Sequence, residues 1–315
     1  MSLFRKPAQA KMGLKVLAYG GFGVGKSTFG LTFPNIAAID SEAGLSRYED
    51  NENIVQIVNT SSVDDVDLAI EEIEENTDSI QTFLIDSETK IYDTMQVSAM
   101  EVEERRALRK GGDIADATVS VKGWGKIKLI NKRLQNLKID LSSKGVHIVG
   151  ISQMEDVKEK KGDNYVKVGE KPSMAKGIEY DYDIVLKLFT KKDPKGNETY
   201  SAIIEKDRTG VTKKGQIIEN PSYDYWKEYC EKNSQLKERP TSFTKDVSKD
   251  IEKMESDDDK ISALIDEFKV KVKKLDAKSQ PQVMKKSKEL GIENPLKTLD
   301  IEGLKKLIEF VNGLE

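Results

Sequence analysis

One octapeptide, GGFGVGKS at residues 20–27, restricts the possible folds of this chain more than any other part of its sequence. It fits the pattern G-x-x-x-x-G-K-[ST]. The apolar run LKVLAY (14–19) precedes it, and a helical pattern from Gly25 to Thr32 follows and ends before Pro34. A strand, a glycine-rich loop and a helix in this order predict a phosphate-binding loop. In such a loop, backbone N–H groups and the positive end of the helix face phosphate oxygens.

The loop predicts a site for ATP and Mg²⁺. Lys26 would place its charge beside the β- and γ-phosphates, and the Ser27 hydroxyl would complete the magnesium shell. The metal also needs a carboxylate from the end of a neighbouring strand, and Asp86, which ends the apolar run TFLID, fits that role. The residues expected to contact the nucleotide are Gly20, Gly21, Phe22, Gly23, Val24, Gly25, Lys26, Ser27 and Thr28.

Apolar runs alternate with polar or amphipathic stretches over the first 206 residues. Several runs are rich in Val and Ile without polar alternation, as expected for strands that are covered on both faces. Helical patterns over 64–76 and 124–141 lie between them. This alternation predicts a three-layer α/β fold with a mainly parallel sheet. After residues 14–19, the predicted strands are 36–40, 54–58, 82–86, 146–152, 183–189 and 200–206.

The composition of the chain changes near residue 231. Residues 231–259 are nearly free of apolar side chains and are predicted to be a charged, solvated linker. Residues 260–315 carry three short amphipathic helical patterns, the last with Asp300 as its N-cap. We therefore predict an ATPase core (1–230), the linker, and a small C-terminal helical region. This region would serve DNA binding, oligomer contact or the docking of a partner.

Two glutamates are candidates for the base that activates water. In many P-loop ATPases a glutamate directly follows the magnesium aspartate, but Ser87 stands there in this chain. Glu88, one residue further on, would point to the other side of an extended chain. Glu42 follows strand 36–40, and neighbouring parallel strands end at the same crevice. Since hydrolysis needs a base close to a water beside the γ-phosphate, Glu42 fits, and Glu88 stays open as the alternative.

These motifs resemble those of the RecA-like ATPases, and more closely the small phage-encoded single-strand-annealing proteins of the Sak type. The resemblance covers about residues 12–230 and is carried by GGFGVGKS, AAIDSEAGL, TFLIDSET and VHIVGISQM. It implies a RecA-like P-loop NTPase core in which Glu42 positions water and Gln153 senses the γ-phosphate and relays its presence to a DNA-binding loop. It also implies a homo-oligomer, ring or filament, in which Lys206 and Arg208 reach a neighbouring subunit's site. Asp207 stands where that family often has Asn.

Positive charge is concentrated between Arg105 and Arg133, where nine basic residues occur with two acidic ones. In a chain of net charge −4, such a local excess suits a groove that follows phosphates, and Trp124 offers a surface for base stacking. A second insertion of about 23 residues follows Gln153 and is long enough to be functional. The residues expected to contact single-stranded nucleic acid are Arg105, Arg106, Arg109, Lys110, Lys122, Trp124 and Lys126.

With the resemblance, which implies a phage recombination protein that promotes annealing or strand exchange, these features predict a protein of the cytoplasm that binds and hydrolyses ATP and binds single-stranded DNA. A single-strand-binding protein is a candidate partner for its C-terminal helices. No membrane contact is expected, because no apolar run reaches the roughly 18 residues that a span requires. Two alternatives are a P-loop small-molecule kinase, against which the lack of an arginine-rich lid segment argues, and a nucleotide-gated oligomeric module with little turnover.

Overall fold

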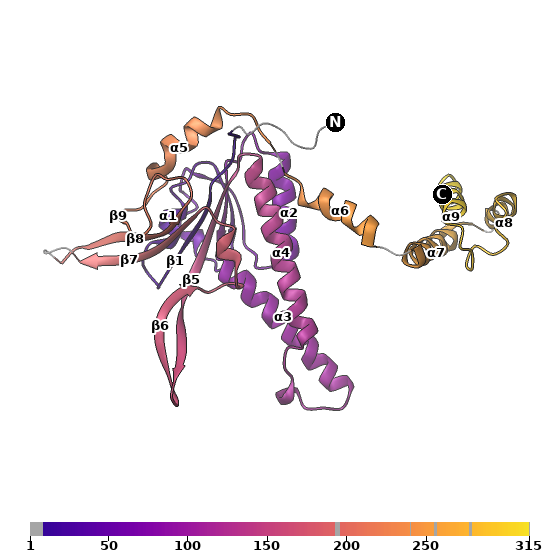
Figure 1. The fold of residues 1–315 in the computed structure, drawn as a ribbon, viewed down its shortest axis with the longest axis horizontal. Helices are drawn as coiled ribbons and strands as arrows, with labels where there is room; N and C mark the ends of the chain where they lie inside the picture. The colour runs from indigo at the N-terminus through magenta and orange to yellow at the C-terminus, as the bar shows by residue number, and fades with distance from the viewer. Residues whose placement is uncertain (1–8, 193–195, 240, 255–256, 277–278, 315) are drawn as a thin grey trace. The chain divides into compact units, whose positions relative to one another are not determined.

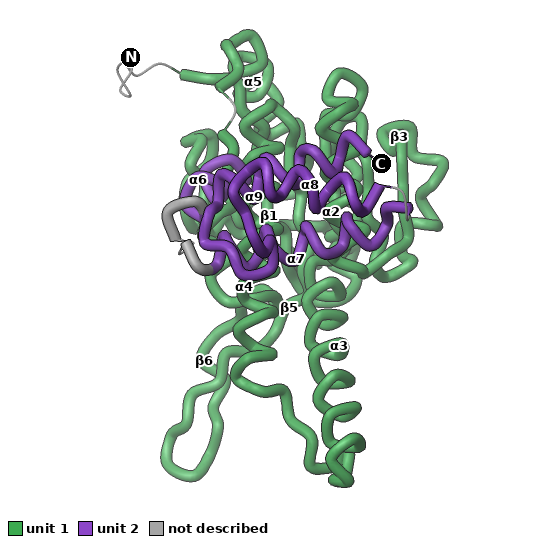
Figure 2. The backbone as a smooth tube through the Cα atoms, turned by 90° about the vertical axis from the view of Figure 1, so that its right-hand side faces the viewer, with its two compact units in different colours: residues 1–243 green, residues 244–315 purple. Residues whose placement is uncertain are grey.

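The computed structural model describes residues 9–192, 196–239, 241–254, 257–276 and 279–314. The chain divides into two compact units, one ending at Phe243 and the other beginning at Thr244 (Figure 2). Within the described ranges, no helix is both long enough and apolar enough to cross a lipid bilayer.

A nine-stranded sheet forms the centre of the first unit (Figure 1). Its strand order is β3-β2-β4-β5-β1-β7-β8-β9, and β6 pairs with the second half of β5. The strands from β3 to β7 in this order pair in parallel, whereas β8 and β9 are antiparallel. The predicted mainly parallel α/β fold is therefore confirmed. The strands are β1 (Lys15–Gly20), β2 (Ile36–Asp40), β3 (Ile54–Val58), β4 (Thr82–Asp86), β5 (His147–Lys161), β6 (Asn164–Pro172), β7 (Ile184–Lys192), β8 (Glu198–Asp207) and β9 (Ile217–Glu219).

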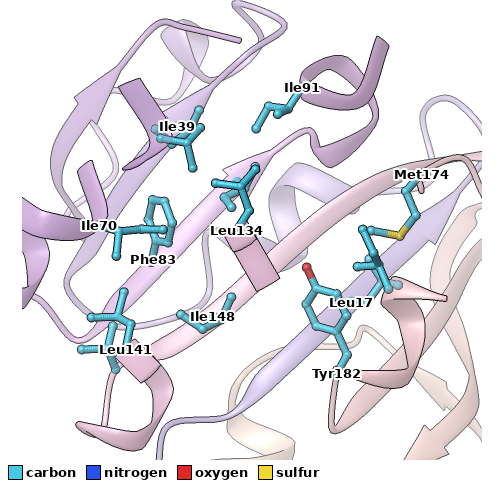
Figure 3. Packing of buried hydrophobic residues seen from close by; sticks show 14 of the residues in the cluster. Leu17, Ile39, Ile70, Phe83, Ile91, Leu134, Leu141, Ile148, Met174 and Tyr182 are labelled. Atoms are coloured by element: carbon cyan, nitrogen blue, oxygen red, sulfur yellow. The ribbon is translucent and has the colours of Figure 1, made fainter. Parts of the chain in front are cut away.

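Side chains of the central strands alternate between two hydrophobic clusters, because successive residues of a strand point to opposite faces. On one face Leu17, Ile39, Phe83 and Ile148 pack against α2, α3 and α4 (Figure 3). On the other face the strands pack against Phe29 of α1 and against α5. The sheet is thus covered on both sides and forms the middle of three layers. These helices are α1 (Lys26–Gly30), α2 (Val63–Glu75), α3 (Glu88–Arg109), α4 (Val121–Ser143) and α5 (Asp224–Ser234).

Two projections extend beyond the edge of the sheet where the parallel strands end (Figures 1 and 2). The first, here called the helical arm, comprises the end of α3, the short 3₁₀ helix η2 (Ile114–Asp116) and the start of α4. The Ser120 hydroxyl fastens the arm, since it accepts the Gly123 N–H at 3.1 Å and donates to Glu103 at 2.6 Å. The second projection is the hairpin of β5 and β6. It replaces the open loop expected after Gln153.

The C-terminal part of the chain is helical. The expected linker, 231–259, contains the end of α5 and the helix α6 (Phe243–Met254), and most of its described side chains are exposed. Helices α7 (Asp257–Lys274), α8 (Gln280–Glu289) and α9 (Ile301–Asn312) follow. Their core includes Phe268, Val283 and Leu307. Asp300 caps α9 as predicted, because its carboxylate accepts the Gly303 N–H at 2.9 Å.

Candidate nucleotide-binding site

The glycine-rich loop joins the carboxyl end of β1 to the start of α1, as the sequence predicted. Gly23 and Gly25 have φ angles of 70° and 82°, a left-handed conformation that favours glycine. A Cβ at Gly25 would lie 3.0 Å from the Tyr200 ring, so glycine also permits this close approach. The Lys26 ammonium donates to the Gly21 carbonyl at 2.5 Å and therefore lies across the loop. Burial lowers the pKa of Lys26, while the nearby carboxylates of Asp86 and Glu42 act in the opposite direction.

A cavity of about 630 Å³ lies above this loop. All nine residues expected to contact the nucleotide line it, together with the predicted Glu42, Asp86 and Gln153. Strand β5 separates β1 from β4, so Gln153 at the P-loop edge of β5 lies between the loop and Asp86. Residues at the ends of four neighbouring parallel strands, β2, β4, β5 and β1, therefore meet around one cavity. The cavity is also lined by Tyr48, Ser87, Met154 and Tyr200.

Ser27 and Asp86 form the pair that suits a magnesium ion. The Ser27 hydroxyl donates to the Asp86 carboxylate at 2.5 Å. Burial raises the pKa of Asp86 to about 6, and the negative charges of Glu42 and Asp40 add to this rise. A hydroxyl and a carboxylate at this spacing match the oxygen ligands that Mg²⁺ takes, and a cation would offset the cost of burying the carboxylate. The residues present therefore fit the ion.

Glu42 faces the cavity because Asp40 shapes the turn after β2. The Asp40 carboxylate accepts the N–H groups of Gly44 and Leu45 at 3.0 and 2.9 Å. Glu42 in turn accepts from the Ser87 hydroxyl at 2.5 Å and from the Gln153 amide at 2.9 Å. The two residues predicted to position water and to sense the γ-phosphate are thus hydrogen-bonded to each other.

Glu88 points away from the nucleotide cavity. Its carboxylate is buried, and it accepts from the Lys138 ammonium at 2.5 Å and from the Tyr182 hydroxyl at 2.7 Å. Glu88 is not among the residues that line the cavity. Of the two glutamates left open by the sequence, Glu42 lines the nucleotide cavity and Glu88 does not.

Lys206 and Arg208 lie away from the nucleotide cavity of their own chain. Lys206 pairs with Val185 across the sheet, and Val185 pairs with Leu17, three residues before Gly20 on β1. At about 3.3 Å per residue, this places Lys206 roughly 10 Å back from the loop edge of the sheet. Both side chains donate to the Tyr180 carbonyl, at 2.8 Å from Lys206 and 3.2 Å from Arg208.

The predicted nucleic-acid residues divide between different surfaces of the helical arm. Arg106, Lys122 and Lys126 line one cavity between α3 and α4, of about 460 Å³, whereas Trp124 lines another. Arg105 pairs with Glu101 at 3.0 Å and Arg106 with Glu103 at 2.7 Å, so acids just outside 105–133 reduce the positive excess. Arg109 and Lys110 lie at the end of α3 near the tip of the arm.

Two features of the site escaped prediction. Tyr200 belongs to a strand that returns beside the loop only after a hairpin, so its place follows from the pairing of β7 with β8. Thr89 connects the site to the hairpin: its hydroxyl accepts the Gln153 N–H at 2.9 Å and donates to the Ser173 carbonyl at 2.7 Å. No local pattern marks either residue in the sequence.

This loop, its magnesium-suited pair and the parallel sheet define a P-loop nucleoside triphosphatase. The chain belongs to the AAA domain family, whose sequence model matches residues 12–246. Nucleotide binding and hydrolysis are the general activities that this membership indicates. Comparison with curated proteins finds no match.

Proposed function

We propose that this protein is a phage recombination ATPase of the Sak type, which binds single-stranded DNA as a homo-oligomer and promotes annealing or strand exchange. One observation carries the proposal. The Gln153 side chain bonds to Glu42 in the nucleotide cavity, and the hairpin that projects from the sheet begins one residue later. A single residue thus adjoins both the nucleotide cavity and a projection that is suited to contact a large ligand.

Hydrolysis in this proposal uses the side chains that face the cavity. Loop N–H groups and Lys26 hold the phosphates, and Glu42 accepts a proton from the attacking water. Ser87 and Gln153 donate to the Glu42 carboxylate and orient it. Ser27 and Asp86 would hold Mg²⁺, which supplies positive charge to the phosphate oxygens when bound.

The same contacts would let nucleotide binding change the conformation of the β5–β6 hairpin. The Gln153 amide can donate to Glu42 or to a phosphate oxygen, and a change between the two would move its backbone. That backbone is bonded to both ends of the hairpin base, since the Ser173 N–H donates to the Gln153 carbonyl at 2.8 Å. The Thr89 hydroxyl is hydrogen-bonded to the backbone of the same two residues, Gln153 and Ser173. ATP and DNA would then influence each other through this short chain of hydrogen bonds.

A steady-state ATPase assay with and without a single-stranded oligonucleotide tests the proposal. We expect turnover to rise when the oligonucleotide is added, and complementary labelled strands to anneal faster with the protein and ATP. The Lys26→Ala protein is the control for contaminating ATPases. If the oligonucleotide leaves the ATP turnover rate unchanged and no annealing is seen, the proposal is contradicted and a nucleotide-gated module is favoured. Transfer of phosphate to a small molecule would favour the kinase.

The oligomer part of the proposal places Arg208 in the site of a neighbouring subunit. Arg208→Ala and Glu42→Ala proteins should each be nearly inactive, whereas their mixture should regain activity. In a random equal mixture, one interface in four joins an intact Glu42 to an intact Arg208, so about a quarter of wild-type turnover is expected once subunits have assembled. Mixtures that stay inactive at every ratio, with turnover per subunit independent of protein concentration, would rule out a shared site.

A further inference from the structure

A cavity of about 730 Å³ lies beside the base of the helical arm, apart from the nucleotide site. Its walls come from Tyr92 on α3, from one side of α4, and from the segment 175–181 that follows β6. Trp124, Lys128 and Lys132 lie four residues apart along α4 and therefore share one face of that helix. We call this space the Trp124 cavity.

The aromatic side chains of this cavity are accessible to a ligand. Trp124 is 45 % exposed, and Tyr92 is half-buried on α3. The other tryptophan of the chain, Trp226, is fully buried in the core and donates to Asp207 at 3.0 Å. An indole left partly in water at the mouth of a cavity is available to stack on a planar ring.

Lys128, Lys132 and Lys176 also line the cavity, and all three are exposed. Within the described part of the chain, none of them forms an ion pair or a side-chain hydrogen bond, in contrast to Arg105, Arg106 and Arg133. Among the described residues that line the cavity, Asp181 is the single acid. Three cations against one carboxylate favour a ligand with more than one negative charge.

Gln135 places a side-chain amide in the same cavity. It is 5 % exposed and lines the cavity. Its side-chain amide forms no hydrogen bond within the described ranges, and it is not one of the buried unpaired groups there, so its polar atoms are open to the cavity. An amide offers both a donor and an acceptor, which is what the edge of a nucleobase requires.

We infer that the Trp124 cavity binds single-stranded DNA, with one base stacked on Trp124 and its edge bonded to Gln135, and with the flanking phosphates held by Lys128, Lys132 and Lys176. The inference rests on the proposed function and assigns the DNA site within it. A duplex fits poorly, because its bases are stacked on one another and cannot enter a cavity. The wall of the cavity at Ala175 lies two residues after Ser173, so bound DNA would contact the segment that is tied to Gln153.

Intrinsic fluorescence tests this inference on the full-length protein, because Trp226 is buried and Trp124 is not. Titration with an unlabelled 20-residue oligothymidine should quench the emission of Trp124, whereas the same concentration of a duplex should quench it far less. Replacement Trp124→Ala should weaken oligothymidine binding, measured by anisotropy of a labelled strand, about tenfold or more, since stacking on an aromatic side chain is worth about that factor.

The three lysines are tested by salt dependence. Each phosphate contact on a single strand contributes about 0.7 to the slope of log affinity against log salt, so Lys128→Ala/Lys132→Ala/Lys176→Ala should reduce that slope by about 2. A matched variant of three exposed lysines elsewhere, Lys213→Ala/Lys214→Ala/Lys227→Ala, makes the same change in net charge. It should keep the wild-type slope. Thermal melting of each variant checks that it is folded.

The outcomes separate the cavity from the wider proposal. If oligothymidine binds but the fluorescence is unchanged and both cavity variants keep wild-type affinity, the inference is overturned while DNA binding stands. The inference is also overturned if the cavity variants keep wild-type affinity and affinity falls only in a variant at the end of α3, Arg105→Ala/Arg106→Ala/Arg109→Ala/Lys110→Ala. If the wild-type protein binds no single strand with or without ATP, both the inference and the proposed function fail.

Discussion

His147 should make the stability of the core depend on pH in a way that can be calculated. It is the only histidine of the chain and begins β5. Its Nδ1 accepts the Leu14 N–H at 3.0 Å, and its ring packs against Phe33 and Tyr223, with centroids 6.0 and 5.4 Å away. Burial lowers the pKa of His147 to about 4, because the charged imidazolium would lose its hydration.

The magnitude follows from the two protonation equilibria. In the unfolded chain the pKa of histidine is about 6.5, so the unfolded state takes up a proton as the pH falls below 6.5 while the folded state does not. The free energy of unfolding must therefore fall with pH across this window, at about 1.4 kcal/mol for each pH unit. From pH 7.5 to 5 the contribution of His147 amounts to about 2 kcal/mol, and it approaches about 3 kcal/mol near pH 4.

Urea unfolding followed by the emission of Trp226, which lies in the same unit, measures this effect. The comparison protein is His147→Gln, whose amide can accept the Leu14 N–H but does not titrate. Carboxylates titrate in both proteins, so the difference between the two pH profiles isolates the imidazole. We expect the wild type to lose about 2 kcal/mol more than the variant between pH 7.5 and 5. Parallel profiles would refute the reasoning, since they would mean that the folded core accepts the proton.

Three further predictions concern the nucleotide site and the buried ion pair of Glu88 with Lys138. Lys26→Ala should lower turnover by at least about 100-fold and strongly weaken ATP binding, because it removes the cation that lies across the loop; unchanged turnover would mean that this loop is not the active site. Glu42→Gln should retain nucleotide binding but lose about 10²–10⁴-fold in turnover, as expected for a general base, and equal turnover would disprove that role. Glu88→Gln should instead destabilise the fold by about 3 kcal/mol, which calorimetry would detect as a lower melting temperature, because Lys138 would stay buried without its counter-charge.

The sheet could be predicted from the sequence because its central strands are covered on both faces and therefore appear as uninterrupted apolar runs. The hairpin could not. Its residues beyond Met154 are mostly exposed and mix both charges, so their strand structure depends on the pairing of β5 with β6 rather than on burial. The place of Tyr200 beside the loop has the same origin, since it follows from an antiparallel pairing that leaves no trace in local hydrophobicity.

Within the site, position at a strand end was informative, whereas the partner of a buried side chain was not predictable. Glu42 and Asp86 could be predicted because neighbouring parallel strands end at one edge. Alternation along the chain predicts that Glu88 points away from the cavity, but its buried partner Lys138 lies 50 residues further along the chain. No spacing in the sequence joins those two residues.

The basic stretch between Arg105 and Arg133 shows how a count of charges can mislead. A window along the sequence adds residues that point in different directions on two antiparallel helices, and it excludes the acids that neutralise some of them. Once α4 is known to span Val121–Ser143, the spacing separates the surfaces: Lys122 and Lys126 belong to one side, and Lys128 and Lys132 belong with Trp124 to the other. A phosphate group is bound only by basic side chains that lie on the same surface and can contact it together. The face of the helix, more than the total charge of the stretch, therefore decides where a nucleic acid can bind.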